Sequence, residues 1–421
     1  MQFSQFGKKM TANAGILSLM DDLGKAKAVP GGKMIMMGGG NPGEVPEFVE
    51  IVRRRLLAVA SDPERFQELV GSYAPPQGEN LFREHLARLL RKEQGWPVDA
   101  ENIVLTNGSQ SAFFMLFNLF AGECAGGIKK KICLPMVPEY IGYADLGLSD
   151  GLFVTARPRL ELLDDGFFKY HIDFDHLPLG EDIAAVCVSR PTNPTGNVIT
   201  DQELARLIDL TSARNIPLIV DSAYGLPFPG MVYGEARPVW NEQMILCLSL
   251  SKLGLPAVRT GIVVASREVV AALTAMNAIM ALTPTNFGAV LAEELVTGGT
   301  INQLSRTVIQ PFYREKMSRA VAAAKASFAG LPCRIHRPEG AMFLWLWFEN
   351  LPISSLELYR RLKDQGVLVV SGHYFFPGLE EEWRHRQECL RITYCRDDAE
   401  VREGLQIIAE VVRAAYAEDG L

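Results

Sequence analysis

The chain has 421 residues, which is too long for one small hydrophobic core and indicates two domains. A formal charge of −7 argues against a nucleic-acid-binding surface, and no apolar run is long enough to span a membrane. The seven cysteines form no C-x-x-C pair and the first residues show no secretory signal, so we expect reduced thiols in a cytoplasmic protein.

Short β-favouring runs alternate with helix patterns over the first two thirds of the chain. These runs are residues 103–106, 131–134, 184–189, 216–221, 244–248 and 261–265. A helix over residues 201–214, capped by Thr200, follows the third of them. Short buried strands separated by helices predict an α/β domain whose sheet is mainly parallel.

The last third of the chain has a different pattern. It begins with a long helix pattern over residues 301–329, which we expect to break near Pro311. The elements that follow are a strand at 342–348, a helix at 355–364, short strands near 367–370 and 390–394, and a helix from Asp398. We therefore predict a large domain from residues 46–300 and a smaller α+β domain from residues 1–45 and 301–421.

The first chemically informative segment is Thr106–Gln110, which follows a predicted strand and opens a helix. In open α/β sheets, ligands bind at the carboxyl ends of the strands. A helix N-terminus also offers unpaired N–H groups and the positive end of a dipole, which together bind phosphate. Simple N-capping by Ser109 would explain the same residues.

Further along the chain, three charged side chains stand beside the ends of predicted strands. Asp221 follows an apolar run and precedes Tyr224, and a buried carboxylate there needs a cationic partner or a capping role. Lys252 stands in Ser249-Leu250-Ser251-Lys252, where partial burial would lower the pKa of its amine, although a surface lysine is the alternative. Arg259 follows, and with Ser109 and Ser249 it would form a phosphate clamp.

Two other segments complete this set. The turn over residues 189–196 contains two prolines and a glycine, which fix the amide of Asn193 unless the turn is only a connection. Arg391 lies in an apolar strand and needs a carboxylate, supplied either by a substrate or by an internal Asp or Glu. Two rival motifs fail on context: G-x-G-x-x-G at residues 38–43 is crowded by prolines, and S-x-x-K at 249–252 lacks its companion motifs.

Together, the motifs N-G-S-Q, P-x-Y, N-P-T-G, D-x-x-Y and S-x-S-K, followed by Arg259 and Arg391, resemble fold-type I aminotransferases of classes I and II. The resemblance extends from Gly40 to Arg391. Residues 107–122, 138–145, 189–201 and 339–348 are similar to the valine–pyruvate aminotransferases in particular. This family implies a large domain with a mainly parallel, seven-stranded type of sheet flanked by helices, and a smaller α+β domain. It also implies pyridoxal 5′-phosphate as cofactor, no metal, and a homodimer.

The resemblance implies a role for each matching residue. Lys252 would hold the cofactor as a Schiff base and move the proton at the substrate Cα, and Asp221 would pair with the ring nitrogen. Tyr224 and Asn193 would contact the ring hydroxyl, and Tyr140 would stack on the ring. The phosphate would be held by Gly108, Ser109, Gln110, Ser249, Arg259 and, from the other subunit, Tyr73. The substrate carboxylate would be held by Gly40, Asn193 and Arg391.

The family resemblance implies transfer of the amino group of L-valine to pyruvate, giving 3-methyl-2-oxobutanoate and L-alanine. The alternatives are a carbon–sulfur β-lyase and an aminotransferase for another amino acid. A cofactor-binding regulator is opposed by the acidic charge and by the short segment before the enzyme-like region. Candidates for an apolar side-chain pocket are Ile16, Leu17, Phe375 and Phe376. Ala257 and Val258 stand where many relatives carry a glycine, which affects only the fine placement of Arg259.

Overall fold

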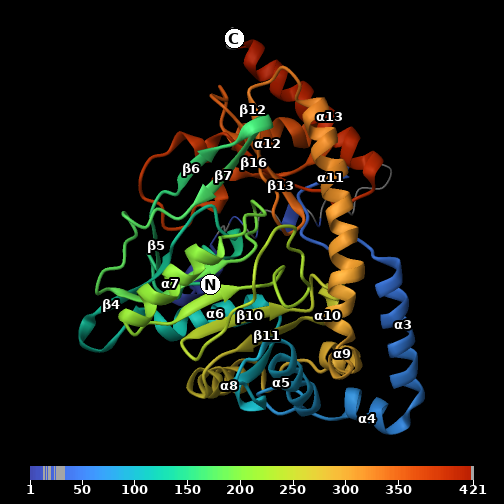
Figure 1. Ribbon diagram of the computed structural model, residues 1–421. Helices are drawn as coiled ribbons and strands as arrows, with labels where there is room; N and C mark the ends of the chain where they lie inside the picture. The colour runs from blue at the N-terminus through green and yellow to red at the C-terminus, as the bar shows by residue number, and fades with distance from the viewer. Residues whose placement is uncertain (13–14, 16, 18–19, 23, 25–33, 419–421) are drawn as a thin grey trace.

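The structure, a computed structural model, describes residues 1–421 except 13–14, 16, 18–19, 23, 25–33 and 419–421. Two β-sheets organise the chain, one in the lower half of Figure 1 and one in the upper half. The long helix α11 (Gln310–Ser327) runs along one side of the molecule, and the C-terminal helix α13 (Asp398–Glu418) lies against it.

The lower sheet has eight strands in the order β2-β11-β10-β9-β8-β4-β3, and β5 also pairs with β4. Its strands are β2 (Ile103–Asn107), β3 (Gly122–Glu123), β4 (Lys129–Leu134), β5 (Phe153–Thr155), β8 (Ile183–Ser189), β9 (Leu218–Asp221), β10 (Met244–Ser249) and β11 (Thr260–Val264). The pairs from β5 through β4, β8 and β9 to β10 are parallel, whereas β11 is antiparallel to both of its neighbours. The predicted α/β fold with a mainly parallel sheet is confirmed.

Both faces of this sheet are buried, which explains why its strands are apolar without alternation. On one face, Ile219 and Ile245 pack with helix α6 in a separate apolar cluster. On the other face, Val220 and Leu246 belong to the main core. The register places Asp221 opposite Ser189 on one side and opposite Cys247 on the other, so neighbouring strands end at the same edge. Side chains that follow these strands therefore converge there.

Helices cover the lower sheet and extend from it. They are α3 (Pro46–Ser61), α4 (Pro63–Gly71), α5 (Asn80–Gln94), α6 (Ser109–Phe120), α7 (Asp201–Ala213), α8 (Arg267–Ala281) and α9 (Phe287–Thr297). Helix α7 begins at the predicted cap, because the Thr200 side chain and Glu203 form a capping box. The short 3₁₀ turns of the chain are η1 (Ala100–Asn102), η2 (Ala125–Gly127), η3 (Ile141–Tyr143), η4 (Asp164–Gly166), η5 (Pro256–Val258), η7 (Gly372–Phe375) and η8 (Arg384–Gln387).

The upper sheet has six strands in the order β15-β16-β13-β12-β7-β6. They are β6 (Arg159–Leu162), β7 (Phe167–His171), β12 (Cys333–His336), β13 (Phe343–Phe348), β15 (Val370–Ser371) and β16 (Cys389–Thr393). The hairpin β6–β7 comes from the middle of the chain, and the sequence analysis predicted neither strand. Three of the four residues of β6 are exposed, and a central lysine interrupts the aromatic residues of β7, so neither strand shows an uninterrupted apolar run.

The long helix pattern of the last third is irregular just before Pro311 but stays helical. Helix α10 (Thr300–Leu304) is followed by a π-helical turn, η6 (Ser305–Ile309), and α11 starts directly after it with Pro311 in its first turn. Proline has no N–H for the usual bond of an α-helix, and the wider π-helical turn before it accommodates this. Helix α12 (Ser355–Asp364), which the sequence predicts, packs against α13.

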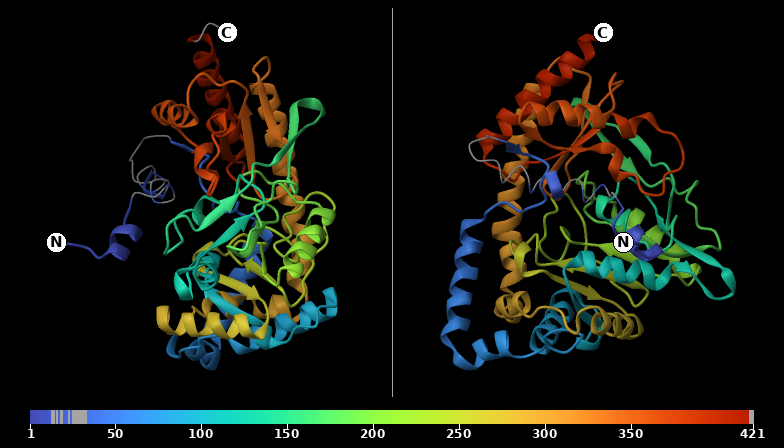
Figure 2. Two further views of the ribbon diagram at one scale, coloured as in Figure 1. Left: turned by 90° about the vertical axis from the view of Figure 1, so that its left-hand side faces the viewer. Right: turned by 180° about the vertical axis from the view of Figure 1, so that it is seen from behind.

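The beginning of the chain is tied to its end. Strand β1 (Ile35–Met36) pairs in parallel with β14 (Val367–Leu368), so residues 35–40 lie beside the upper sheet. Helix α1 (Gln5–Met10) is capped by Ser4 and lies near the surface in both views of Figure 2. Over the described ranges, no helix is both long and apolar enough to cross a membrane.

Candidate active site

Asp221 ends β9 at the edge where the strands of the lower sheet converge. The side chain is only 8% exposed, and its Oδ2 accepts a hydrogen bond of 2.6 Å from the Tyr143 hydroxyl. Its Oδ1 accepts a second one, of 2.9 Å, from the N–H of Ala223. Burial raises the pKa of the carboxyl, while these hydrogen bonds and the charge of Lys252 oppose the rise. The structure thus holds an oriented carboxylate at the strand end.

Lys252 follows β10 and lies over the same edge. Its Nζ donates a hydrogen bond of 2.6 Å to the carbonyl oxygen of Gly40 and lies 5.4 Å from the ring centre of Tyr224. Burial lowers the pKa of this amine to about 8, and the charges of Arg391 and Arg259 act in the same direction. A lysine with a lowered pKa has a substantial neutral fraction near pH 7, and the neutral amine is the nucleophile.

Arg259, which the sequence predicts to bind phosphate, lies at the start of α6. Gly108, the N-cap of α6, has a φ of +80°, and a Cβ there would lie 2.1 Å from Nη2 of Arg259. Arg259 itself has a φ of +52°, and its Nη1 donates to the Ser251 hydroxyl at 3.4 Å. The Arg259 guanidinium therefore lies at the N-terminus of a helix. A cation together with helix N-terminal N–H groups is suited to bind an anion.

Other predicted phosphate ligands lie near the start of α6. The Ser109 hydroxyl donates to the carbonyl of Leu248 at 3.3 Å, and Gln110 donates to the carbonyl of Gly142 at 3.0 Å. Ser249 ends β10, and its Oγ accepts a hydrogen bond of 3.1 Å from the N–H of Ser251. Ala257 and Val258 lie in η5, directly before the strained Arg259, and line a hollow of about 420 Å³ beside it.

Arg391 enters the site from the upper sheet. It lies on β16, is 2% exposed, and its Nη1 donates to Asn193 Oδ1 at 2.8 Å. Its Nη2 donates to the carbonyl of Gly38 at 2.6 Å, while its Nε is buried without a partner among the described residues. The guanidinium lies 4.3 Å from the ring centre of Phe343 and 5.4 Å from that of Phe375. Burial lowers its pKa only to about 10, so it stays charged and has an unused donor for an anion.

The remaining predicted residues lie in different surroundings. The ring of Tyr140 meets that of Tyr143 edge-on, with the centres 5.4 Å apart. Tyr73 is 83% exposed on the segment after α4. Phe376 packs in the upper core beside Trp383, whereas Leu17 is exposed. Ile16 lies outside the described residues. Of the three pocket candidates that the structure describes, Phe375 is the one placed beside Arg391.

Two residues of this site were not predicted. Tyr143 donates the shorter of the two hydrogen bonds that Asp221 accepts. Glu139 is fully buried. Glu139 accepts hydrogen bonds from the N–H and the hydroxyl of Ser189 at 2.8 and 2.7 Å, and burial raises its pKa to about 8. Both stand in the turn after β4, where no periodic pattern marks an inward-facing side chain. The only signal available was the unusual string P-E-Y-I-G-Y itself.

The fold and this strand-end site are those of an aminotransferase. The sequence model of the aminotransferase class I and II family matches residues 56–408, and the chain belongs to that family. It is similar to the valine–pyruvate aminotransferase of Escherichia coli (strain K12), with 48% identity over 418 residues that cover 99% of this chain and 100% of the other.

Solved structures agree with this assignment. A putative amino-acid aminotransferase from Psychrobacter arcticum 273-4 has a TM-score of 0.96 and 43% identity, with 99% of each chain covered. The valine–pyruvate aminotransferase of Salmonella typhimurium LT2 has a TM-score of 0.88 and 47% identity, with 96% of this chain and all of that chain covered. The aspartate aminotransferase of Thermus thermophilus, at 21% identity and a TM-score of 0.79, shares the fold.

Aminotransferases of this family use pyridoxal 5′-phosphate, and the described residues fit that cofactor. Lys252 offers an amine of lowered pKa, Asp221 offers a buried carboxylate for a protonated ring nitrogen, and Arg259 lies at the N-terminus of α6 for the phosphate. Within the described ranges, no group of three or more His, Cys, Asp or Glu side chains is arranged to hold a metal ion.

Proposed function

We propose that the protein transfers the amino group of L-valine to pyruvate, giving 3-methyl-2-oxobutanoate and L-alanine. The observation that carries the proposal is the 48% identity to the E. coli valine–pyruvate aminotransferase along 99% of the chain. The geometry around Arg391 supports it, because a buried guanidinium with an unused N–H lies between two aromatic rings. An amino acid with a carboxylate and a small apolar side chain suits such surroundings.

In this proposal, Arg391 and Asn193 bind the substrate carboxylate, with the backbone of Gly40 beside it. Asn193 is already oriented, because its Oδ1 accepts from Arg391, which leaves the amide N–H₂ free to face the ligands. Lys252 would hold the cofactor through its amine, and the same amine in its neutral form would move the proton at the substrate Cα. Its hydrogen bond to Gly40 places this amine beside the carboxylate-binding residues.

The remaining side chains hold the cofactor. When bound, pyridoxal phosphate supplies the electron sink for the reaction. Asp221, oriented by Tyr143, keeps the ring nitrogen protonated, Tyr224 and Asn193 contact the ring oxygen, and Tyr140 packs on the ring. The phosphate is bound by Gly108, Ser109, Gln110, Ser249 and Arg259.

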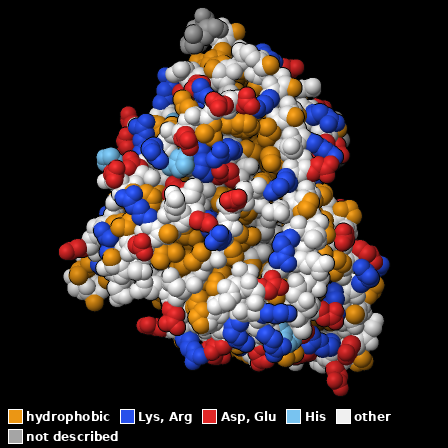
Figure 3. Space-filling model, viewed as in Figure 1, with side chains coloured by type: hydrophobic (Ala, Val, Ile, Leu, Met, Phe, Trp, Pro, Cys, Tyr) orange, Lys and Arg blue, Asp and Glu red, His pale blue; other side chains and the backbone are white. Residues whose placement is uncertain are grey.

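We also propose a homodimer in which Tyr73 of one subunit reaches the phosphate of the other. Tyr73 is too exposed for a side chain without a partner, and the hollow beside Arg259 is open and bordered by Phe287. Figure 3 shows orange patches between the charged side chains on the face that it views. Apolar side chains are exposed on α3, on α4 and at the end of α8. They are Val49, Leu56, Leu57, Phe66, Val70, Ile279, Met280 and Leu282. Such a surface is expected to be covered by a second copy.

A subunit-mixing experiment tests the dimer. Tyr73→Phe should weaken cofactor binding, and Lys252→Ala should abolish turnover. Mixing the two variants under exchange conditions creates one site with both native residues if Tyr73 acts across the interface, and activity then returns. No recovery in a mixture that sedimentation shows to be hybrid dimer would exclude this role.

A cytoplasmic location is the last part of the proposal, supported by seven cysteines that are all free.

An absorbance experiment tests the reaction. The purified protein is expected to carry a visible cofactor band that L-valine removes and pyruvate restores, with L-alanine and 3-methyl-2-oxobutanoate as products. A band that responds to another amino acid but not to valine would overturn the substrate assignment. Release of pyruvate and ammonia from a cysteine conjugate, without reaction of valine, would favour the β-lyase instead. A folded protein that shows no band after addition of the cofactor would overturn the whole proposal.

A further inference from the structure

A buried lysine lies outside the residues discussed so far. Lys169 is the central residue of β7, is 2% exposed, and uses all three of its donor hydrogens. Its Nζ donates to Asn197 Oδ1 at 2.9 Å, to the carbonyl of Val198 at 3.0 Å and to the carboxylate of Glu339. Two of the three acceptors therefore belong to the turn that follows β8, on the other sheet.

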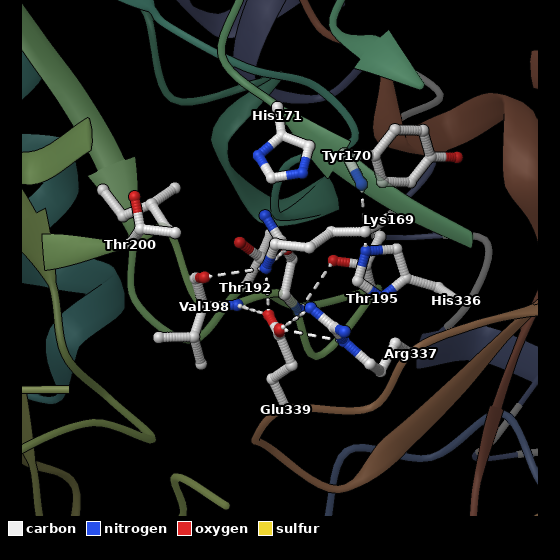
Figure 4. A network of polar contacts seen from close by, with 12 residues as sticks. Lys169, Tyr170, His171, Thr192, Thr195, Val198, Thr200, His336, Arg337 and Glu339 are labelled. Atoms are coloured by element: carbon white, nitrogen blue, oxygen red, sulfur yellow. Dashed lines mark hydrogen bonds and ion pairs between the residues drawn. The ribbon is translucent and has the colours of Figure 1, made fainter. Parts of the chain in front are cut away.

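Glu339 binds the same turn from the opposite side. The carboxylate oxygen that pairs with Lys169 also accepts from the N–H of Val198 at 3.1 Å, and the other oxygen accepts from Arg337 at 2.9 Å. The main-chain N–H of Glu339 donates to the carbonyl of Gly196 at 3.1 Å. Figure 4 shows Lys169, Arg337 and the Val198 backbone pointing toward the Glu339 carboxylate.

The turn held in this way carries Asn193. It is closed by two hydrogen bonds, from Thr192 N–H to Asn197 O at 2.9 Å and from Gly196 N–H to Thr192 O at 2.8 Å. Gly196 has a φ of +70°, and a Cβ there would lie 2.6 Å from the carbonyl oxygen of Gly340. The turn therefore packs directly against the segment that leads into β13.

The same segment leads to Arg391. Strand β13 pairs with β16 in a register that places Trp345 opposite Arg391, whose Nη1 lies 2.8 Å from Asn193 Oδ1. The Lys169–Glu339 pair, the main-chain bond from Glu339 to Gly196 and the Arg391–Asn193 contact thus join the turn to the upper sheet. The first two hold the turn itself, and the third depends on where the turn places Asn193.

We propose that Lys169 and Glu339 are positioning residues, which dock the 192–198 turn on the upper sheet so that Asn193 and Arg391 together bind the substrate carboxylate. This inference rests on the proposed function, because it assigns the carboxylate to Arg391 and Asn193. An ion pair suits the task better than apolar packing, since its hydrogen bonds fix direction and register as well as distance. Arg337 and the Val198 amide satisfy the remaining acceptor positions of Glu339, so the buried charges are balanced.

Two variants and a matched control test the proposal. Lys169→Met removes the three donors at similar volume, and Glu339→Gln removes the charge but keeps one acceptor. Lys316→Met breaks another partly buried pair, in which Nζ lies 3.1 Å from Asp398 Oδ1 between α11 and α13, far from the turn in the fold. For the first two variants, KM for the amino acid and for the 2-oxo acid should rise about tenfold while kcat changes less than about threefold. The control should leave KM unchanged.

Two readouts do not depend on turnover. Spectral titration of the cofactor-loaded protein with 2-methylalanine, which has no hydrogen at Cα, should show about tenfold weaker binding in both variants. Hydrogen exchange of the cofactor-free protein should be faster at the amides of Gly196 and Val198 in Lys169→Met and unchanged in Lys316→Met. The exchange measurement separates this inference from the proposed function, because it requires no amino acid at all.

The outcomes are decisive in either direction. Unchanged exchange at Val198 would overturn the docking role, and faster exchange with unchanged KM and unchanged titration would overturn the positioning role. If Lys169→Met does not fold, Glu339→Gln decides by the same measurements. Wild-type protein that lacks transamination but shows the expected exchange pattern would refute the proposed function and leave the docking of the turn established.

Discussion

Two lysines of this chain, the buried Lys169 and the partly buried Lys252, have different surroundings. Lys169, in the upper sheet, pairs with the carboxylate of Glu339 and with two oxygens of the turn. Lys252, at the edge of the lower sheet, donates to one carbonyl and has no ion-pair partner among the described residues. Burial lowers the pKa of both amines, but Glu339 opposes the change at Lys169, whereas Arg391 and Arg259 add to it at Lys252, whose pKa falls to about 8.

The difference shows how one residue type serves two purposes in one fold. A buried ammonium with a full set of acceptors is held charged and acts as a connector. A buried amine surrounded by other cations is driven toward its neutral form and becomes a nucleophile. The positions of the two lysines in the sequence agree with these two purposes. Lys252 follows the end of a strand, where ligands bind in open α/β sheets, whereas Lys169 lies in the middle of a strand.

The largest effect is expected where the nucleophile is removed. Lys252→Ala should lower the rate of transamination by about 10⁴-fold or more, because no other group holds the cofactor and moves the proton. Lys316→Ala, which also removes a partly buried lysine, should keep the wild-type rate and serves as the control. Steady-state kinetics measure both. If the rate of Lys252→Ala were within tenfold of the wild-type rate, Lys252 would not be the nucleophile, and the contrast with Lys169 would not hold.

The next effect concerns stability. Here the loss of Glu339, the partner of Lys169, should have a large effect and the loss of Lys252 a small one. Glu339→Ala leaves the Lys169 ammonium buried without its carboxylate and should cost about 3–5 kcal/mol of unfolding free energy. In cofactor-free protein, Lys252→Ala should lose nothing or gain stability, because its amine has no carboxylate to lose. Urea unfolding of the three cofactor-free proteins measures the difference. Equal losses in both variants would show that the two lysines are not distinguished by their partners.

The pH dependence of cofactor attachment sharpens the comparison further. Because the pKa of Lys252 is about 8, the rate at which cofactor-free protein takes up pyridoxal phosphate should rise about tenfold per pH unit below 8 and level off above it. Between pH 8 and 10.5 the unfolded chain binds more protons at this lysine than the folded one, so its contribution to stability rises with pH in that window. Stopped-flow absorbance gives the profile, and a rate still rising at pH 10 would refute the lowered pKa.

The smallest effect is expected at Tyr143, whose hydroxyl donates to Asp221. Tyr143→Phe removes the 2.6 Å hydrogen bond but leaves the one from Ala223, so the carboxylate stays in place and is less well stabilised. We expect cofactor binding to weaken about fivefold. Tyr416→Phe loses a bond of 2.7 Å to the carbonyl of Glu349, far along α13, and is the matched control. Equilibrium dialysis of both variants measures the dissociation constant, and equal values would exclude a role for Tyr143.

Six strands of the lower sheet could be predicted from the sequence because they contain apolar runs, and β8, β9 and β10 end in polar residues. Asp221 and Lys252 were recognisable because they stand at or just after such strand ends, and the irregularity before Pro311 followed from the chemistry of proline. The β6–β7 hairpin was missed because β6 is largely exposed and a lysine interrupts the aromatic residues of β7, and Lys169 resembles a solvated residue until Glu339 is known to face it. The contacts of Tyr143 and Glu139 depend on the path of a turn, which no spacing reveals. The boundary between the domains and the role of each site residue remain predictions.

Because β7 lies in the middle of the sequence, it is synthesised well before β12, with which it pairs in the upper sheet. Lys169 leaves the ribosome 170 residues before Glu339, and Gly38 leaves it 353 residues before Arg391. During synthesis the lower sheet has all of its strands once residue 264 has emerged, whereas the hairpin must wait in water for β12 and the strands beyond it. Three of the five residues of β7 are aromatic, namely Phe167, Phe168 and Tyr170, and they stay in water until then. The largely exposed β6, which pairs with β7 in the hairpin, covers one edge of this strand and leaves only the other edge open to pairing with another nascent chain.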